Sequence, residues 1–202
     1  MTLRTISITV TAVSLACSGG QPDKPVRQEA DTANAASSSA PAASRLIRES
    51  GIGPVELGVT LDSLRKVNPG LNISRTSDGE GVALVEIVAG GDTLIAYADE
   101  EDPSAPVDLS KRVRSLETMS PRFQTAEGVH AGSLVTNVEK AYGRLTQIDK
   151  SEIESREYVT FAHQPATLTF RLENGAGLFP DDSMTTTRIS PDSRIFSIAV
   201  RK

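Results

Sequence analysis

The stretch that decides the fold runs from Val82 to Ala98 and reads VALVEIVAGGDTLIAYA. Two runs rich in β-branched and other apolar residues, Val82–Ala89 and Thr93–Ala98, flank the pair Gly90-Gly91. Two glycines between such runs are typical of a tight hairpin turn, because its central residues need positive φ angles. The sequence therefore predicts an antiparallel hairpin here.

A second hairpin is expected further along the chain, from the runs Tyr158–Ala162 and Ala166–Leu172 with His163-Gln164-Pro165 at the turn. In the latter run, large apolar residues alternate with Thr and Arg. Such alternation is typical of a strand with one buried and one solvated face. Similar alternation near the C-terminus predicts a last strand around Phe196 to Val200.

Each hairpin follows a segment with helical spacing of apolar residues. We expect helices near 61–68 and 134–142. Thr60 can cap the first helix at its N-terminus, and Asn68-Pro69 stops it because the residue before proline avoids the α region. Gly143 can end the second helix.

The two segments form a repeated pattern. At an offset of 74 residues, Gly58 falls on Gly132 and Val85 on Val159, and the last strand of each half matches at an offset of 82. Self-similarity of this kind indicates an internal repeat. The expected fold class is α+β, with two tandem modules of one helix and an antiparallel meander, and with the helices on one face of the sheet.

The expected domain organisation has four parts. Residues 1–16 are a signal peptide, and 17–44 are a modified cysteine with a flexible tether. Residues 45–111 are module one and 112–202 module two, with a strand at 112–119 that closes module one and a second repeat from about 120. The tether is rich in Ser, Ala and Pro and has a single large aliphatic residue, so it cannot offset the entropy of folding.

The N-terminal residues are typical of an export signal. Arg4 precedes a short apolar stretch that ends Val13-Ser14-Leu15-Ala16-Cys17, and Cys17 is the only cysteine of the chain. This stretch resembles a bacterial lipobox, although Ser14 stands where Leu is preferred. The resemblance implies acylation of Cys17 and anchoring in a membrane. Because Ser18 rather than Asp follows, it also implies an outer-membrane or cell-surface protein that faces the periplasm or the exterior.

A family resemblance is carried by short motifs. Gly58-Val59-Thr60, Leu64 and Pro69-Gly70 resemble the start of small outer-membrane lipoproteins of the SmpA/OmlA type, and Ala141-Tyr142-Gly143 lies in a second, partial copy. The tandem arrangement also resembles the β-lactamase-inhibitor-protein-like fold. These resemblances imply a protein that binds other proteins and has no catalytic site.

The expected function is a non-catalytic, membrane-anchored module that binds protein or has a structural role in the cell envelope. The loops 99–111 and 173–193 occupy equivalent places and are expected to approach a shared edge. We expect Phe179 to anchor a partner with a basic surface. The acidic residues that would favour such a partner are Asp99, Glu100, Glu101, Asp181 and Asp182.

Other function classes find little support in the composition. A net charge of -5 without a basic stripe argues against a nucleic-acid partner. One Cys and two widely spaced His predict neither a metal site nor a cofactor, and no nucleophile elbow appears. The alternative is a small-ligand carrier or an enzyme with an unrecognised site. A pocket of about 300 Å³ or more would favour that alternative, and an exposed apolar patch without a deep pocket would favour a binding module.

Overall fold

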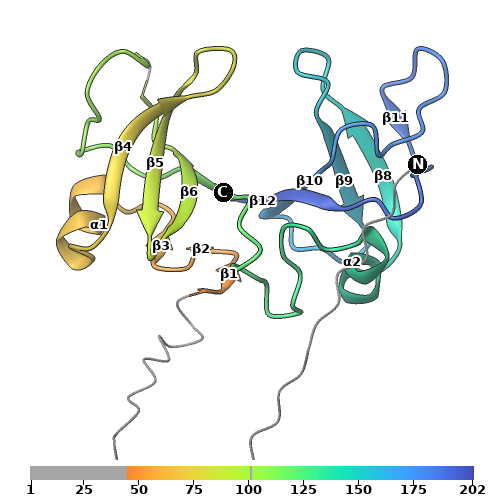
Figure 1. Ribbon diagram of the computed structural model, residues 1–202, viewed down its shortest axis with the longest axis horizontal. Helices are drawn as coiled ribbons and strands as arrows, with labels where there is room; N and C mark the ends of the chain where they lie inside the picture. Colours follow the sequence, from red (N-terminus) through yellow and green to blue (C-terminus); the bar gives the residue numbers. More distant parts are fainter. Residues whose placement is uncertain (1–44, 101) are drawn as a thin grey trace, which may run out of the picture. The chain divides into compact units, whose positions relative to one another are not determined.

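The computed structural model describes residues 45–100 and 102–202. Their main feature is one antiparallel sheet of nine strands, in the order β11-β8-β9-β10-β12-β7-β6-β5-β4 (Figure 1). Its strands are β4 (Asn72–Ser77), β5 (Ala83–Ala89), β6 (Asp92–Tyr97), β7 (Ser115–Thr118), β8 (Leu145–Lys150), β9 (Glu157–Phe161), β10 (Leu168–Leu172), β11 (Thr185–Thr186) and β12 (Ile195–Arg201).

Three shorter strands and two helices complete the described part. The strands β1 (Ile47–Arg48), β2 (Gly51–Ile52) and β3 (Val55–Glu56) form a small antiparallel sheet. The helices are α1 (Leu61–Val67) and α2 (Val135–Tyr142), which lie where the sequence predicts them. Among the described residues, neither helix has the length and apolar character needed to cross a membrane.

The predicted hairpin at Val82–Ala98 forms as β5 and β6. Ala89 pairs with Asp92, which leaves Gly90 and Gly91 as the two turn residues. Their φ angles are +59° and +83°, a conformation that L side chains rarely adopt. The two glycines thus fix the register in which Val85, Ile87 and Leu94 face the core.

The predicted fold class is wrong. Strands far outnumber helices among the described residues, and nine of them form one large antiparallel sheet, rather than two helix-plus-meander modules with helices on a face. The last strands of the two meanders, β7 and β12, pair with each other and join all the strands. Each helix has about two turns and buries only two or three side chains, so loops cover much of the core side.

The two halves nevertheless use corresponding hydrogen bonds. Here the first half means α1 with β4–β7, and the second half means α2 with β8–β10 and β12. Tyr97 pairs with Ser115 in the first half, and Arg171 pairs with Ser197 in the second. These pairs match at the offsets of 74 and 82 residues.

At the seam, Leu116 pairs with Val200 and Thr118 with Ile198. Val200 is the counterpart of Thr118 and Ile198 that of Leu116, so each residue faces the counterpart of its own neighbour two positions along. A local two-fold axis through the pair Glu117–Ala199 would produce this arrangement. The buried apolar side chains of both halves form one continuous core cluster.

Candidate functional site

Two of the predicted site residues, Cys17 and Glu101, lie outside the described residues. The other acidic residues of the first loop have partners within the protein. Glu100 is buried and forms an ion pair with Arg75 of β4, and its second carboxylate oxygen accepts a hydrogen bond from the backbone N–H of Asp108 at 3.0 Å. Asp99 forms an ion pair with Arg114. Much of the charge in this acidic run is therefore compensated locally.

The second predicted loop is held in place by a buried carboxylate. Glu157 of β9 accepts hydrogen bonds from the backbone N–H groups of Gly175 and Gly177, at 2.9 and 2.6 Å. The ring of Phe179 lies against Gly177, where a Cβ would come within 2.5 Å of it. Phe179 is half-buried and packs partly on the core, whereas Asp181 and Asp182 are exposed.

The two loops do not share an edge of the sheet, contrary to the sequence-based expectation. Arg75 of β4 donates hydrogen bonds to the carbonyls of Ala105 and Pro106 in the first loop. The second loop contributes β11, which pairs with β8. Because β4 and β11 are the opposite outer strands of the nine, each loop extends a different edge. A basic partner that contacts both loops remains a prediction, but the residues expected to bind it fall into two separate groups.

A different surface lies on the outer face of the sheet, the side opposite the core. Alternate residues of each strand point there, and they include exposed or half-exposed large side chains on neighbouring strands. Tyr97, Met119 and Phe196 are 39%, 48% and 38% exposed. A groove of about 300 Å³ runs across this face, and we call it the outer-face groove. It is lined by Thr76, Ser77, Asp78, Leu84, Ile95, Tyr97, Ser115, Glu117, Met119, Arg156, Arg171, Ala199 and Arg201.

The outer-face groove is bounded by the tips of two hairpins. Ser77 and Asp78 belong to the β4–β5 hairpin, and Arg156 belongs to the β8–β9 hairpin. Both hairpin loops extend beyond their strands at the top of the view in Figure 1. The carboxylate of Asp78 accepts hydrogen bonds from the backbone N–H groups of Glu80 and Val82, which fixes the first tip. Arg156 forms an ion pair with Glu154.

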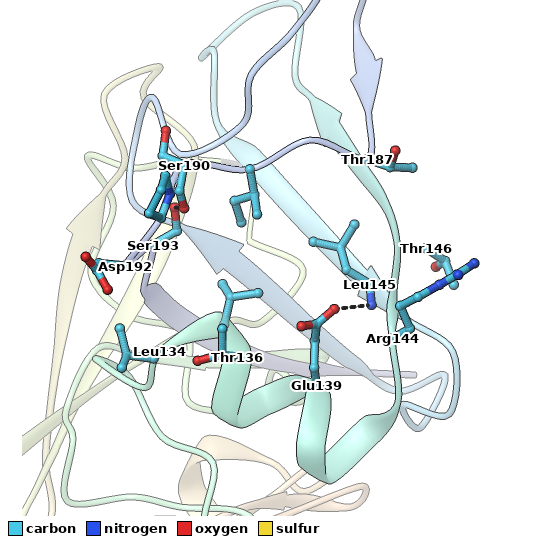
Figure 2. Close-up of a pocket in the computed structure, with 13 residues that line it drawn as sticks. Leu134, Thr136, Glu139, Arg144, Leu145, Thr146, Thr187, Ser190, Asp192 and Ser193 are labelled. Carbon is cyan, nitrogen blue, oxygen red and sulfur yellow. Dashed lines mark hydrogen bonds between the residues drawn. The ribbon is translucent and has the colours of Figure 1, made fainter.

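A larger pocket lies between α2, the start of β8 and the loop 187–193, and has a volume of about 650 Å³ (Figure 2). Figure 2 shows Glu139 reaching from α2 to the backbone N–H of Leu145, a hydrogen bond of 2.9 Å. The rest of the lining combines hydroxyl groups with a few apolar and charged side chains. These residues are Leu134, Val135, Thr136, Arg144, Thr146, Thr187, Ile189, Ser190, Pro191, Asp192 and Ser193.

The corresponding place in the first half is closed by the chain itself. There the backbone N–H of Asp62, at the start of α1, donates to the carbonyl of Leu109 at 2.8 Å, and the Leu109 side chain packs partly on the core. At the offset of 82 residues, Leu109 corresponds to Pro191, which is exposed. The α2 pocket is thus open where its counterpart is filled.

A third cavity of about 520 Å³ lies beside α1 and is more apolar. Val67, Leu71 and Phe123 contribute to its walls, together with Arg45 at the start of the described chain. Two pockets therefore exceed the volume that would favour a small-ligand carrier, and an exposed apolar surface is present as well. Volume alone does not separate the two function classes. No group of three or more His, Cys, Asp or Glu side chains able to hold a metal ion occurs among the residues described.

One hydrogen bond in the second half shifts two pKa values. The hydroxyl of Tyr142 donates to the carboxylate of Glu127 at 2.6 Å. Burial raises the pKa of Tyr142 above its ordinary value, and the bond to Glu127 raises it further. The same bond lowers the pKa of Glu127. This pair ties the end of α2 to the preceding loop and has a structural role.

The residues of the outer-face groove were not predicted from the sequence. The signal was available in the strand alternation, because a sheet with one buried face must expose every second side chain on the other. The expected strands at Thr93–Ala98 and Ala166–Leu172 contain Tyr97 and Arg171 at such outward positions. The strand order was needed to show that these two side chains line one groove.

Comparisons with known proteins identify no family for this chain. No protein-family model matches the chain. No curated protein matches it either. Among solved structures, the chain is similar to the uncharacterized protein yfeY from Escherichia coli, with 12% sequence identity and a TM-score of 0.47 over 76% of this chain and 97% of that one.

Proposed function

We propose that this chain is a lipid-anchored bacterial envelope protein that binds another protein, without catalysis, through the outer face of its sheet. The observation that carries the proposal is the set of exposed side chains Tyr97, Met119 and Phe196 on neighbouring strands of that face. Aromatic residues, Met and Arg are enriched where proteins meet, and a grouped apolar surface marks an interaction site more often than scattered residues do.

The anchoring part of the proposal rests on the lipobox-like stretch that ends at Cys17 and on the Ser, Ala and Pro-rich residues 18–44. Their composition predicts a flexible chain, which at that length would have a root-mean-square span of about 30 Å. Acylation at Cys17 would keep the sheet close to a membrane and leave it free to meet a partner there. We place the protein in the outer membrane or at the cell surface because Ser18, and not Asp, follows Cys17.

The test is site-specific photo-crosslinking in cells that make the protein. A photoreactive residue at Ser115 or Ala199 lies in the floor of the groove, whereas one at Arg65 lies on an exposed side of α1. We expect one protein to be captured from the two groove positions and not from Arg65. Capture should be lost in the double variant Tyr97→Ala, Met119→Ala. Equal capture from all three positions, or capture that this double variant leaves unchanged, would contradict the proposal.

A second candidate is a small-ligand carrier that uses the α2 pocket. It is favoured by the contrast between Pro191, which leaves that pocket open, and Leu109, which closes the corresponding place. Mass spectrometry of the purified chain should then detect a small molecule that is absent from a Thr136→Trp variant, because the larger side chain fills the pocket. Identical spectra for the two proteins would rule out this function.

A further inference from the structure

We propose that the outer-face groove binds an acidic segment of the partner protein, with separate carboxylates held by Arg171 and by Arg201 and adjacent apolar side chains against Tyr97 and Met119. The location rests on the proposed function. The chemistry of the partner is new and follows from the charges and contacts below.

Arg171 and Arg201 have no internal carboxylate partner among the described residues. No ion pair or side-chain hydrogen bond joins either guanidinium to the part of the chain that the structure describes. The Nε of Arg171 is shielded from solvent and still lacks a hydrogen-bond acceptor. By contrast, Arg75, Arg114 and Arg156 each pair with a carboxylate. Arg171 and Arg201 both line the same groove.

Arg171 is also held in position by an aromatic ring. Its guanidinium carbon lies 4.6 Å from the centroid of the Phe196 ring, a cation–π contact that restricts the side chain. A guanidinium offers a rigid fork of donors that matches the two oxygens of a carboxylate. Because the fork is already oriented, less conformational entropy is lost when an acidic group binds.

The acidic groups that face the groove form no ion pair with these arginines. Glu117 lies in the floor, and its carboxylate accepts a hydrogen bond from the hydroxyl of Ser197. The carboxylate of Asp78 is occupied by the backbone N–H groups of its own turn. The groove is thus lined by three arginines and two acidic residues, and neither acidic residue forms an ion pair with Arg171 or Arg201.

The correspondence between the halves gives the groove two different ends. At the offset of 74 residues, Arg171 corresponds to Tyr97, and at the offset of 82, Arg201 corresponds to Met119. Ser115 pairs with both Tyr97 and Arg201, so the apolar and basic side chains stand two strands apart, about 10 Å. A segment with an apolar and an acidic residue at that separation complements both ends.

A protein segment fits this surface better than a lipid bilayer does. The hairpin residues Ser77 and Asp78 rise at one side of the groove and Arg156 at the other, so its floor is recessed. A flat array of anionic head groups would meet the hairpin tips before it reached Arg171. An extended or looped polypeptide can enter between them.

The experiment uses the full chain with Cys17→Ser and two short labelled peptides. One peptide alternates Leu and Phe with Glu, and the other carries Lys in place of every Glu. Fluorescence anisotropy at low ionic strength should show binding of the Glu peptide and at least about tenfold weaker binding of the Lys peptide. Arg171→Ala and Arg201→Ala should each weaken binding of the Glu peptide about tenfold. Arg188→Ala is the matched control, because Arg188 is exposed and lies outside the groove, and it should change nothing.

Several outcomes would overturn the inference. These are equal binding of the two peptides, no binding of the Glu peptide up to about 1 mM, or an equal effect of Arg188→Ala. Arginine-dependent binding to phosphatidylglycerol vesicles without binding of the Glu peptide would assign the groove to a membrane surface instead. If the peptides fail while the groove crosslinks depend on Tyr97 and Met119, the proposed function stands and only the acidic chemistry is wrong.

Discussion

At the scale of single residues, Glu100 has a structural role, although it lies in an acidic run that was predicted from the sequence to bind a partner. Its side chain is 4% exposed and pairs with Arg75, which is also largely buried. Removing one member of a buried ion pair leaves the other charge without compensation, at a cost of about 3–5 kcal/mol. We expect Glu100→Gln to lower the free energy of unfolding by about 3 kcal/mol, measured by urea denaturation.

Asp99→Asn is the matched control for Glu100→Gln. Asp99 pairs with Arg114, but both side chains are about half exposed, at 43% and 57%. Exposed pairs contribute about 0–1 kcal/mol because solvent screens them. A loss of stability as large for Asp99→Asn as for Glu100→Gln would show that burial is not what distinguishes the two carboxylates.

The pair Tyr142–Glu127 predicts a loss of stability at alkaline pH. An unfolded tyrosine ionises near pH 10. Because the pKa of Tyr142 is raised in the folded protein, its contribution is fully present below about pH 10 and is lost as the pH rises further. We expect Tyr142→Phe to reduce the fall in unfolding free energy between about pH 9 and pH 11. An unchanged slope in that range would contradict the assignment, since Tyr97 and Tyr158 remain in the variant.

The lowered pKa of Glu127 acts at the other end of the pH scale. Its contribution to stability is present above the ordinary pKa of a glutamate and is lost as the pH falls through the folded value. Tyr142→Phe removes the first cause of that shift, the hydroxyl hydrogen bond. The same variant should therefore weaken the acid-side loss as well, which gives an internal check on the alkaline result.

Cys17 carries the prediction about anchoring. If the chain is acylated there, Cys17→Ala leaves no thiol to modify, and the protein should move from the membrane fraction to the soluble fraction or remain as the uncut precursor. Intact mass and fractionation measure both results. Cleavage elsewhere with an unmodified Cys17 would show that the lipobox-like stretch is an ordinary export signal.

At the scale of elements, the sequence predicted the helices and strands that are determined by residues within or next to them. The hairpin β5–β6 follows from its two glycines, and α1 begins at Thr60, whose hydroxyl accepts a hydrogen bond from the N–H of Ser63 at 3.2 Å. In contrast, β4 reads NISRTS and is an outer strand in which half-exposed polar residues carry no clear alternation. Its pairing with β5 stabilises it, and that pairing is not visible in its own residues.

Prediction of the candidate site was limited in the same way, because it depends on how distant strands pair. The sequence predicted that equivalent loops would meet, but it could not give the order of the strands. The pairing of β7 with β12 places the two halves side by side and sends the loops to opposite edges, while it brings Tyr97, Met119, Arg171 and Arg201 onto one groove. These four residues had only strand alternation to mark them, and alternation does not distinguish a binding face from a solvated one.

At the scale of the whole molecule, the seam between β7 and β12 makes the two halves depend on each other. Four residue pairs join these strands, and the apolar side chains of both halves form one cluster. The strands of both halves form one continuous sheet. Local defects in either half should therefore affect the stability of both.

This dependence can be tested with one core substitution in each half. Ile87 of β5 and Phe170 of β10 are fully buried, and truncation of such side chains to Ala costs about 2–5 kcal/mol. We expect Ile87→Ala and Phe170→Ala each to lower hydrogen-exchange protection equally in β5 and in β10, with one cooperative transition in urea. If Ile87→Ala lowered protection in β5 alone, the seam would be weak and the halves would unfold separately. In that case the outer-face groove, whose lining comes from both halves, would be lost when the less stable half unfolds, and partner binding would disappear at a lower urea concentration than the secondary structure of the other half does.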